Sequence, residues 1–437
     1  MSTSVNTSTL AAQLSAAASK RATQRPQRRV VITGTGAISP AGIGVPALWD
    51  AARSGRCCIT PLPDRFEGFP AKVGGQIPGF DPLEHFSKKE ARRFARFVQL
   101  AIVAADEALA QSGICLEDED LTRFACCFGS GIGGLEVFER EVGRLVEGGP
   151  KKVSPLFIPA MISNMAAGDL AIRYGLRGEC TNIVTACATG THCVGEAFRL
   201  VRAGYADVAL CGGTEEGLSN MALAGFGNLG ALTKASDPLR ASRPFDAERS
   251  GFVAGEGAGA LILESLEHAQ ARGAAIIAEV TGFGSTGDGY HMTAPEPSGE
   301  GAARAMRMAL DEAGFTPAQL GHVNAHGTST HANDAMEAAA LRRLAGDELS
   351  ARIPVTSVKG CTGHLLGGAG AIEAIVCALS VADSCVPPTA GFATPDPEAP
   401  ANVSAQLRED LPQLVALSNS FGFGGHNASL ALSPYLG

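Results

Sequence analysis

The residue in this sequence best placed to act as a nucleophile is Cys187, in the motif TACATGTHC. It follows an apolar run that predicts a strand over 182–185, and it precedes a run with helical spacing. A cysteine at such a strand-to-helix turn lies near the helix N-terminus, whose dipole favours the thiolate. A buried structural cysteine is the alternative when this residue is taken alone.

A second motif, VNAHGTSTHANDAMEAA, offers a histidine that could face a pocket. His326 follows a short apolar run, stands on a glycine turn and is trailed by Thr328 and Thr330. A metal site formed with His322 and His331 is the alternative. The spacing of these histidines is not that of a pair on one predicted helix, and no fourth ligand is adjacent, so a metal is not favoured.

Two further motifs add a charged pair and a glycine-rich turn. SVKGCTGHLLGGAGAIEA contains Lys359, His364 and Glu373. A lysine in such apolar surroundings needs an anionic partner, and Glu373 is the nearest candidate along the chain. In SNSFGFGGHNASL, Phe421 and Phe423 alternate with glycines, whose amides can point at an anion. A solvent-facing capping turn and an ordinary turn after a strand are the respective alternatives.

The segment GSGIGG at 129–134 resembles a dinucleotide-binding loop, because it follows a predicted strand. No second strand ending in an acid follows at the expected distance, so this interpretation is weak. The 12 cysteines are scattered through apolar runs without a CxxC pair or a zinc-type spacing. This pattern indicates buried free thiols in a reducing compartment.

Charge and hydropathy exclude several classes of protein. The net charge is −9, which argues against non-specific binding of nucleic acid. The longest apolar stretch, 365–382, is interrupted by Glu373 and is predicted to be a buried helix, so no membrane span is expected. The first 29 residues are rich in Ser, Thr, Ala and Arg and contain no acid. A disordered tail and a cytoplasmic protein are predicted; an organelle transit peptide is the alternative.

Alternating strand and helix patterns must position these motifs, and they predict an α/β layered fold. Asp334 and Glu337 are expected at the start of a helix, where acids are favoured. The predicted strands are 124–128, 182–185, 208–211, 258–263, 353–357 and 415–418. The predicted helices are 90–112, 195–203, 301–313, 334–344 and 369–380.

Two echoes within the sequence suggest an internal duplication. RVVITGTGAISPAG, from Arg29, has a related pattern in IIAEVTGFGSTGDG, from Ile276. TACATGTHCVGEAFRLV, from Thr185, has the same shape as VKGCTGHLLGGAGAIEAIVCAL, from Val358. The echoes recur in the same order, so we expect two similar halves. The expected division is a tail over 1–28, a first half over 29–275 with the nucleophile, and a second half over 276–437 with the His/His/Lys residues.

Together the four motifs resemble the β-ketoacyl-acyl carrier protein synthase family, most closely its type II elongating enzymes. The resemblance runs from about residue 29 to the C-terminus and includes RASRPFDAERSGFVAGEGAG, from Arg240. It implies a thiolase-like fold of two βαβαβαββ-type halves in a five-layer αβαβα arrangement, usually as a homodimer. It also implies the decarboxylative condensation of a Cys-bound acyl group with malonyl-acyl carrier protein, in fatty-acid elongation.

The resemblance assigns roles by position. Cys187 would accept the acyl group, His326 and His364 would be the catalytic histidines, and Lys359 and Glu373 their supporting ion pair. Phe423 would be the gating aromatic residue, whose amide joins that of Cys187 in an oxyanion hole. The implied substrate-binding residues are Ile132 and Phe226 at the acyl pocket, Thr328 and Thr330 along the phosphopantetheine channel, Thr293 near its mouth, and Phe421.

The implied partner is acyl carrier protein, and no metal or redox cofactor is implied. Because the carrier is acidic, a basic patch is expected, and FSKKEARRFARF supplies one. Lys88, Lys89, Arg92, Arg93 and Arg96 are predicted to lie at the start of one helix. The family places carrier docking at Lys89, Arg92 and Arg93; a solvated helix face is the alternative.

Other functions remain open at this point. A ketosynthase of a type II polyketide or polyene pathway would share the chemistry. A non-catalytic chain-length-factor-like partner subunit is disfavoured by Cys187, and a thiolase by the lack of a second cysteine in NSFGFGG. The sequence departs from the family pattern at His331, Asn333 and His426, and in the segments RFAR and GNLGAL.

Overall fold

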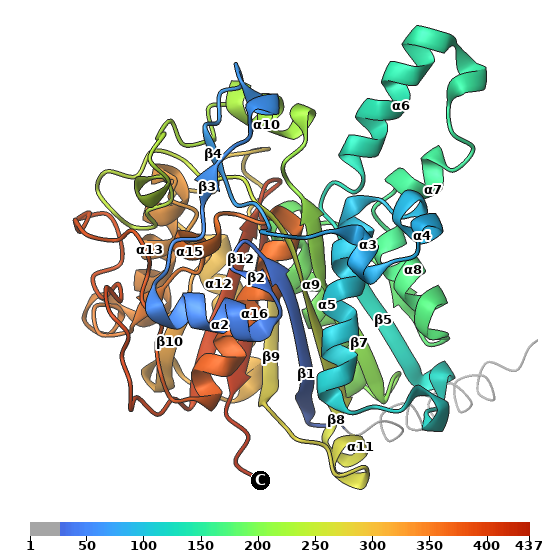
Figure 1. Cartoon of the computed structure of the whole chain (residues 1–437). Helices are drawn as coiled ribbons and strands as arrows, with labels where there is room; N and C mark the ends of the chain where they lie inside the picture. Colours follow the sequence, from blue (N-terminus) through green and yellow to red (C-terminus); the bar gives the residue numbers. More distant parts are fainter. Residues whose placement is uncertain (1–26) are drawn as a thin grey trace, which may run out of the picture.

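The computed structural model describes residues 27–437, which form one 11-stranded mixed sheet with helices on its faces (Figure 1). The predicted tail over 1–28 therefore falls almost wholly outside the described residues. The strands of this sheet are β1 (Val30–Ser39), β2 (Gly42–Ile43), β5 (Phe124–Gly129), β6 (Cys180–Thr181), β7 (Val208–Glu216), β8 (Glu256–Ser265), β9 (Ala278–Gly287), β10 (Leu320–Asn324), β11 (Val355–Thr356), β12 (Val415–Gly422) and β13 (His426–Ser433). A separate ribbon pairs β3 (Thr60–Pro61) with β4 (Val73–Gly74).

The sheet contains two sets of strands with the same pattern. Its order is β11-β10-β12-β13-β9-β1-β8-β7-β5-β6, with β2 paired to β1. In the first set, β5 is parallel to β6 and β7, and antiparallel pairs link β7, β8 and β1. In the second set, β10 is parallel to β11 and β12, and antiparallel pairs link β12, β13 and β9. The sets join where β1 pairs with β9, although the division at 275/276 itself stays a prediction.

The TGxG motif that occurs at 33–36 and again at 281–284 has a structural reason. A Cβ at Gly36 in β1 would overlap the carbonyl oxygen of Ala104, and one at Gly284 in β9 would overlap that of Ala305. Only glycine lets a helix lie this close to each strand. The helices so admitted are α5 (Arg96–Ser112) and α12 (Glu300–Ala313).

Helices form three layers around the two sets of strands. On one outer face α5 and α8 (Met165–Tyr174) pack on β1, β5, β7 and β8; on the other, α12 packs on β9 and β13 with α13 (His331–Ala345) beside it. Between the sets lie α9 (Thr189–Arg202) and α16 (Ala369–Ala382), which contact strands of both. The resulting αβαβα order buries a central apolar core around these two helices.

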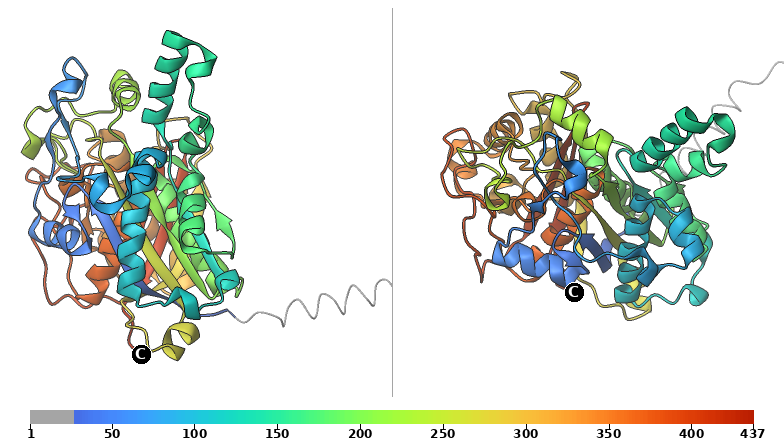
Figure 2. Two further views of the ribbon diagram at one scale, coloured as in Figure 1. Left: turned by 45° about the vertical axis from the view of Figure 1, so that its right-hand side comes forward. Right: turned by 45° about the horizontal axis from the view of Figure 1, so that its top comes forward.

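The remaining helices cover the edges and ends. These helices are α2 (Val45–Ser54), α3 (Pro82–His85), α4 (Lys88–Arg93), α6 (Leu135–Gly148), α7 (Phe157–Met161), α10 (Asn220–Asn228), α11 (Leu266–Ala271), α14 (Asp347–Ser350) and α15 (Lys359–Thr362). In both views of Figure 2, α6 projects from the body of the molecule. No helix in residues 27–437 is long and apolar enough to span a membrane.

Three predicted elements differ from the structure. The helix predicted over 90–112 is two helices, α4 and α5, because the chain is extended at Phe94 and Ala95; the Gln99 side chain donates to the Phe94 carbonyl there, at 3.1 Å. The strand predicted over 182–185 is irregular, since the chain leaves the sheet after Thr181. The strand predicted over 353–357 pairs only at 355–356.

Candidate active site

Cys187 stands at a sharp turn between the edge of the sheet and helix α9. A single 3₁₀ turn over Ala186–Ala188 connects the irregular segment after β6 to the first residue of α9. Ala186 has a φ of 50°, a left-handed conformation that is uncommon outside glycine. The turn places the half-buried Cys187 side chain in the wall of a cavity, near the positive end of α9.

A matching turn precedes α16. A 3₁₀ turn over Leu366–Gly368 leads into that helix, and Leu366 has a φ of 48°. The two turns lie close together because α9 and α16 cross at Gly190, where a Cβ would lie 2.8 Å from the amide nitrogen of Ala371. The second pair of related motifs in the sequence therefore corresponds to two turns that face each other. His364, just before the second turn, is thereby placed close to the first turn.

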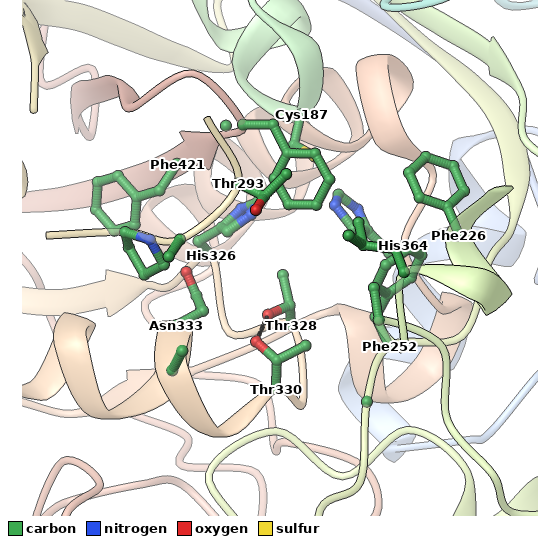
Figure 3. A pocket seen from close by; sticks show the side chains of 18 of the residues that line it. Cys187, Phe226, Phe252, Thr293, His326, Thr328, Thr330, Asn333, His364 and Phe421 are labelled. Atoms are coloured by element: carbon green, nitrogen blue, oxygen red, sulfur yellow. Dashed lines mark hydrogen bonds between the residues drawn. The ribbon is translucent and has the colours of Figure 1, made fainter. Parts of the chain in front are cut away.

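Three side chains that could react meet at these turns. The Cys187 Sγ and a ring nitrogen from each of His326 and His364 all lie within 4.8 Å of one another. The two imidazoles meet edge to face, with ring centroids 5.3 Å apart. His326 follows β10 and His364 follows α15, and Figure 3 shows both pointing into the cavity beneath Cys187.

A buried ion pair lies behind His326. Lys359, in α15, pairs with Glu373, in α16, and both side chains are buried. The Lys359 Nζ also donates to the carbonyl oxygen of His326 at 2.6 Å and lies 3.2 Å from its Nδ1. Burial raises the pKa of Glu373 to about 7 although Lys359 opposes that rise. The sequence-predicted pair is thus brought together, and it fixes the imidazole of His326.

The hydrogen bonds assign the tautomers of both histidines. Since the Lys359 ammonium can only donate, the Nδ1 of His326 accepts, and the proton of the neutral ring lies on Nε2. The Nδ1 of His364 accepts from the amide of Leu366 at 3.3 Å, so its proton also lies on Nε2. Burial lowers the pKa of each histidine well below its usual value, and Lys359 lowers it further. The Nε2 of His364 has no partner within residues 27–437.

The electrostatics of Cys187 differ from the sequence expectation. Burial raises the pKa of this thiol to about 11, and the negative charge of Glu215 adds to the rise. The positive charge of Lys359 and the amide of Phe423 act in the opposite direction but do not outweigh burial. The helix terminus was expected to favour the thiolate; here desolvation is the larger effect.

One carboxylate at the site was not predicted as functional. Glu337, in α13, accepts hydrogen bonds from the amides of His326 and Gly327 at 2.8 and 2.9 Å. Its expected position at a helix start is wrong, because α13 begins at His331 and only Asp334 lies in its first turn. The Glu337 side chain is instead buried under the histidine turn. Burial raises its pKa to about 7. A carboxylate 11 positions after His326 was the available signal, but no sequence rule ties that spacing to a turn.

A cavity of about 360 Å³ leads to Cys187 and collects most of the predicted residues. The hydroxyls of Thr328 and Thr330 lie 2.8 Å apart in its wall, as the dashed line in Figure 3 shows. Thr293 and Asn333 also line it. The aromatic side chains in the wall are Phe226, Phe252, Phe421 and Phe423.

The aromatic residues form a connected wall. The rings of Phe226 and Phe252 lie 5.4 Å apart, and Phe226 lies 6.4 Å from Phe423. Phe421 packs edge to face on His326 at 5.9 Å. The amide of Phe423 points at the Cys187 sulfur, so this donor lies beside the atom that would carry an acyl group.

Ile132 and the basic patch lie outside this cavity. Ile132 is 39% exposed and is not among the cavity residues of this single chain. Lys89, Arg92 and Arg93 are exposed on the capped helix α4. Arg96 was predicted to share their helix, but it starts α5, where it binds Glu256 through two hydrogen bonds of 2.6 Å. It is therefore not part of the exposed patch.

The residues disfavour two other kinds of site. Cys187, His326 and His364 could offer three metal ligands, but the buried ammonium of Lys359 beside His326 opposes a cation there. In GSGIGG, the amides of Gly131 and Ile132 donate to the Glu215 carboxylate, at 2.9 and 3.3 Å. They are not free to bind a pyrophosphate. Among the described residues, neither His322 nor His331 lies close enough to His326 to form a metal site with it.

Comparison with known proteins defines the class. Residues 27–269 match the family described as beta-ketoacyl synthase, N-terminal domain, and residues 277–393 match its C-terminal domain. The chain therefore belongs to the β-ketoacyl synthase family. It is 47% identical over 410 residues to 3-oxoacyl-[acyl-carrier-protein] synthase 2 of Staphylococcus aureus, covering 93% of this chain and 99% of the relative. The Synechocystis protein of the same name is 44% identical over 412 residues, covering 94% and 99%.

Solved structures agree on the fold. A β-ketoacyl synthase from Burkholderia phymatum superposes with a TM-score of 0.84 at 34% identity, covering 93% of this chain and all of that one. A ketosynthase bound to its type II polyketide acyl-carrier protein and a hexaketide gives 0.86 at 33%, covering 94% and 100%. The predicted thiolase-like α/β fold is confirmed.

Proposed function

We propose that this protein condenses a Cys187-bound acyl group with malonyl-acyl carrier protein, giving 3-oxoacyl-acyl carrier protein and CO2, in fatty-acid elongation. The observation that carries the proposal is the grouping of Cys187, His326 and His364 within 4.8 Å at the base of a cavity lined by aromatic residues. A nucleophile faces two N–H donors there, which suits covalent catalysis followed by stabilisation of an enolate.

In the first half-reaction, the Cys187 sulfur attacks the thioester carbonyl of an acyl carrier. The carbonyl oxygen becomes negative, and the amides of Cys187 and Phe423 would donate to it. The carbon–sulfur bond of the carrier then breaks, and the carrier leaves as a thiol, taking up the proton that the Cys187 thiol gives up. The acyl group stays on Cys187 as a thioester.

In the second half-reaction, malonyl carrier enters the same cavity. The bond to its carboxylate breaks, CO2 leaves, and the electron pair moves onto the thioester oxygen. The Nε2–H groups of His326 and His364 would donate to that oxygen, which accounts for their shared tautomer. The new carbanion attacks the acyl-Cys187 carbonyl, and the Cys187 sulfur leaves as a thiolate, which takes up one proton from solvent. The two half-reactions consume no oxidant and no reductant, so we propose that no redox cofactor takes part. We also assign no step to a metal ion.

Fatty-acid use is preferred to polyketide use on sequence similarity. The relatives named 3-oxoacyl-[acyl-carrier-protein] synthase 2 are 44–47% identical, whereas the polyketide ketosynthase is 33% identical. A non-catalytic partner subunit is disfavoured because the nucleophile and both histidines are present and in contact. A cytoplasmic location stays a prediction.

We also propose a homodimer, because one edge of the molecule exposes apolar side chains. The sheet ends at the short strand β6, whose outer edge has no neighbouring strand in the described residues. Ile158, Ile172 and Val184, on α7, α8 and the segment after β6, are 55%, 69% and 50% exposed there. An unpaired strand edge beside such side chains suits a second copy of the chain. Ile158→Asp should give a monomer by light scattering, whereas Leu239→Asp, elsewhere on the surface, should not; a wild-type monomer would contradict this.

Product analysis tests the proposed function. Acyl carrier thioesters of increasing length are mixed with malonyl carrier and the protein, and 3-oxoacyl products are measured by mass spectrometry. We expect products with saturated chains, and none with Cys187→Ala. Failure with every saturated chain, but turnover of a polyketide intermediate, would favour the polyketide alternative.

A further inference from the structure

Glu215 is a buried carboxylate that the reaction above does not use. It lies near the end of β7, the strand that packs against the turn at Leu366–Gly368, and its side chain is fully buried. Within residues 27–437 its hydrogen-bond donors are three backbone amides and one hydroxyl, so no positively charged side chain neutralises it directly. Burying a carboxylate is costly in free energy, and these four hydrogen bonds offset part of that cost.

The four bonds join two segments that are far apart in the sequence. One oxygen of Glu215 accepts from the amide of Gly131 at 2.9 Å and from that of Gly367 at 3.1 Å. The other accepts from the hydroxyl of Ser130 at 2.6 Å and the amide of Ile132 at 3.3 Å. Glu215 thus ties the loop 130–133 to the turn 366–368.

The two segments can lie this close because the turn has a glycine, Gly367, at the contact. A Cβ at Gly367 would lie 2.5 Å from the amide nitrogen of Gly131 and 2.8 Å from the Glu215 carboxylate. The turn held in this way is the one whose Leu366 amide sets the tautomer of His364. The loop held in this way carries Ile132. One carboxylate therefore sets the spacing between a catalytic histidine and Ile132.

We propose that Glu215 is a positioning residue that holds the turn after His364 against the loop 130–133, so that the His364 imidazole keeps its place beside Cys187. This inference rests on the proposed function. In Glu215→Gln, one oxygen becomes an amide that can only donate, so at least one of the three backbone amides loses its acceptor whichever way the side chain turns. The loop and the turn should then separate.

The test compares Glu215→Gln with Glu216→Gln and with Ser130→Ala, which removes one donor to Glu215 and also the acceptor of the Gly133 amide. Glu216 is the next residue of β7 and is also buried, but it lies beside Glu136 and not at the loop. Decarboxylation of malonyl carrier and acylation of Cys187 by a saturated acyl carrier are measured separately by mass spectrometry. We expect the ratio of the decarboxylation rate to the acylation rate to fall about tenfold or more in Glu215→Gln, and less in Ser130→Ala, with no change in Glu216→Gln.

A second readout does not depend on any acyl substrate. Because the Glu215 charge opposes ionisation of Cys187, alkylation of this thiol by iodoacetamide at fixed pH should be faster in Glu215→Gln, by about threefold or more. Buried cysteines such as Cys377 should stay unreacted, which shows that the variant is folded. An unchanged ratio of the two rates in a folded Glu215→Gln, or an equal change in Glu216→Gln, would overturn the proposal. Wild-type protein that accepts no acyl group would instead overturn the proposed function.

Discussion

Lys359 acts on the reactive thiol through its charge and on His326 through its hydrogen bonds. Its ammonium lowers the pKa of Cys187 against the larger effect of burial, which holds that pKa at about 11. The thiolate fraction should therefore rise about tenfold per pH unit below 11. In Lys359→Met the pKa should rise further, so alkylation by iodoacetamide at pH 9 should be slower than in wild type. Equal or faster alkylation would show that the lysine does not act on the thiol.

Substitution of His364 should slow one half-reaction and leave the other in place. His364 donates to the malonyl-derived oxygen in the proposed mechanism but has no part in the first acyl transfer. In His364→Ala, decarboxylation of malonyl carrier should fall about 10²-fold or more, whereas acylation of Cys187 should persist. His85→Ala, an exposed histidine on α3, is the control and should change neither rate. Loss of both half-reactions in a folded His364→Ala would contradict the division of roles.

The ion pair can be tested for its contribution to folding separately from catalysis. Removing one partner of a buried pair typically costs about 3–5 kcal/mol, because a charge is left without compensation. Lys359→Met should lower the free energy of unfolding in urea, and adding Glu373→Leu should restore much of it. Activity should not return in the double variant, since His326 would still lack its donor. Recovery of activity would show that the pair serves stability alone.

At the scale of elements, the contact between α9 and α16 controls the position of the nucleophile turn. A Cβ on Gly190 would lie 2.8 Å from the Ala371 amide and 3.0 Å from the Gly367 carbonyl, both backbone atoms that cannot move independently. Gly190→Ala should therefore cost about 1–3 kcal/mol of unfolding free energy and reduce acylation of Cys187. Gly168→Ala, in α8, meets only the flexible Met165 at 3.5 Å and should be neutral or stabilising. Equal stability of the two variants would contradict this account.

Elements with strong periodicity could be predicted from the sequence. The helix expected over 301–313 is Glu300–Ala313, and that expected over 369–380 is Ala369–Ala382. The break at Phe94 and Ala95 could not be predicted, because it depends on a bond from the Gln99 side chain that replaces part of the helical ladder. The strand expected over 182–185 has the right composition, but tertiary structure uses this segment for the turn before Cys187.

The candidate site could also be predicted only in part. Five of its residues could be named from the sequence because each lies in a short motif that resembles a family pattern: Cys187, His326, His364, Lys359 and Glu373. Glu337 and Glu215 could not, because each contacts residues distant in the sequence through backbone amides. Such contacts leave no local pattern. The raised pKa of Cys187 was missed for a related reason, since burial depends on the whole fold.

At the scale of the molecule, an acidic protein must attract an acidic carrier through a local basic surface. The exposed residues of α4 offer one, held by a capping box between Ser87 and Glu90. Lys89→Glu and Arg92→Glu should raise the KM for carrier-bound substrates several-fold without changing alkylation of Cys187 by iodoacetamide. The effect should shrink at high salt, since exposed charges are screened. Arg352→Glu, also exposed but paired with Glu348, is the control. An unchanged KM in the α4 variants would show that the carrier docks on another part of the surface.

Peptide mapping by mass spectrometry can show whether the acyl group is carried on Cys187 between the two transfers. The protein is mixed with a saturated acyl carrier, a sample is digested, and the remainder is treated with malonyl carrier. We expect one acyl group per chain, on the peptide containing Cys187, which disappears as an equal amount of 3-oxoacyl carrier forms. An acyl group on another cysteine, or product formed while Cys187 remains unmodified in every sample, would contradict it.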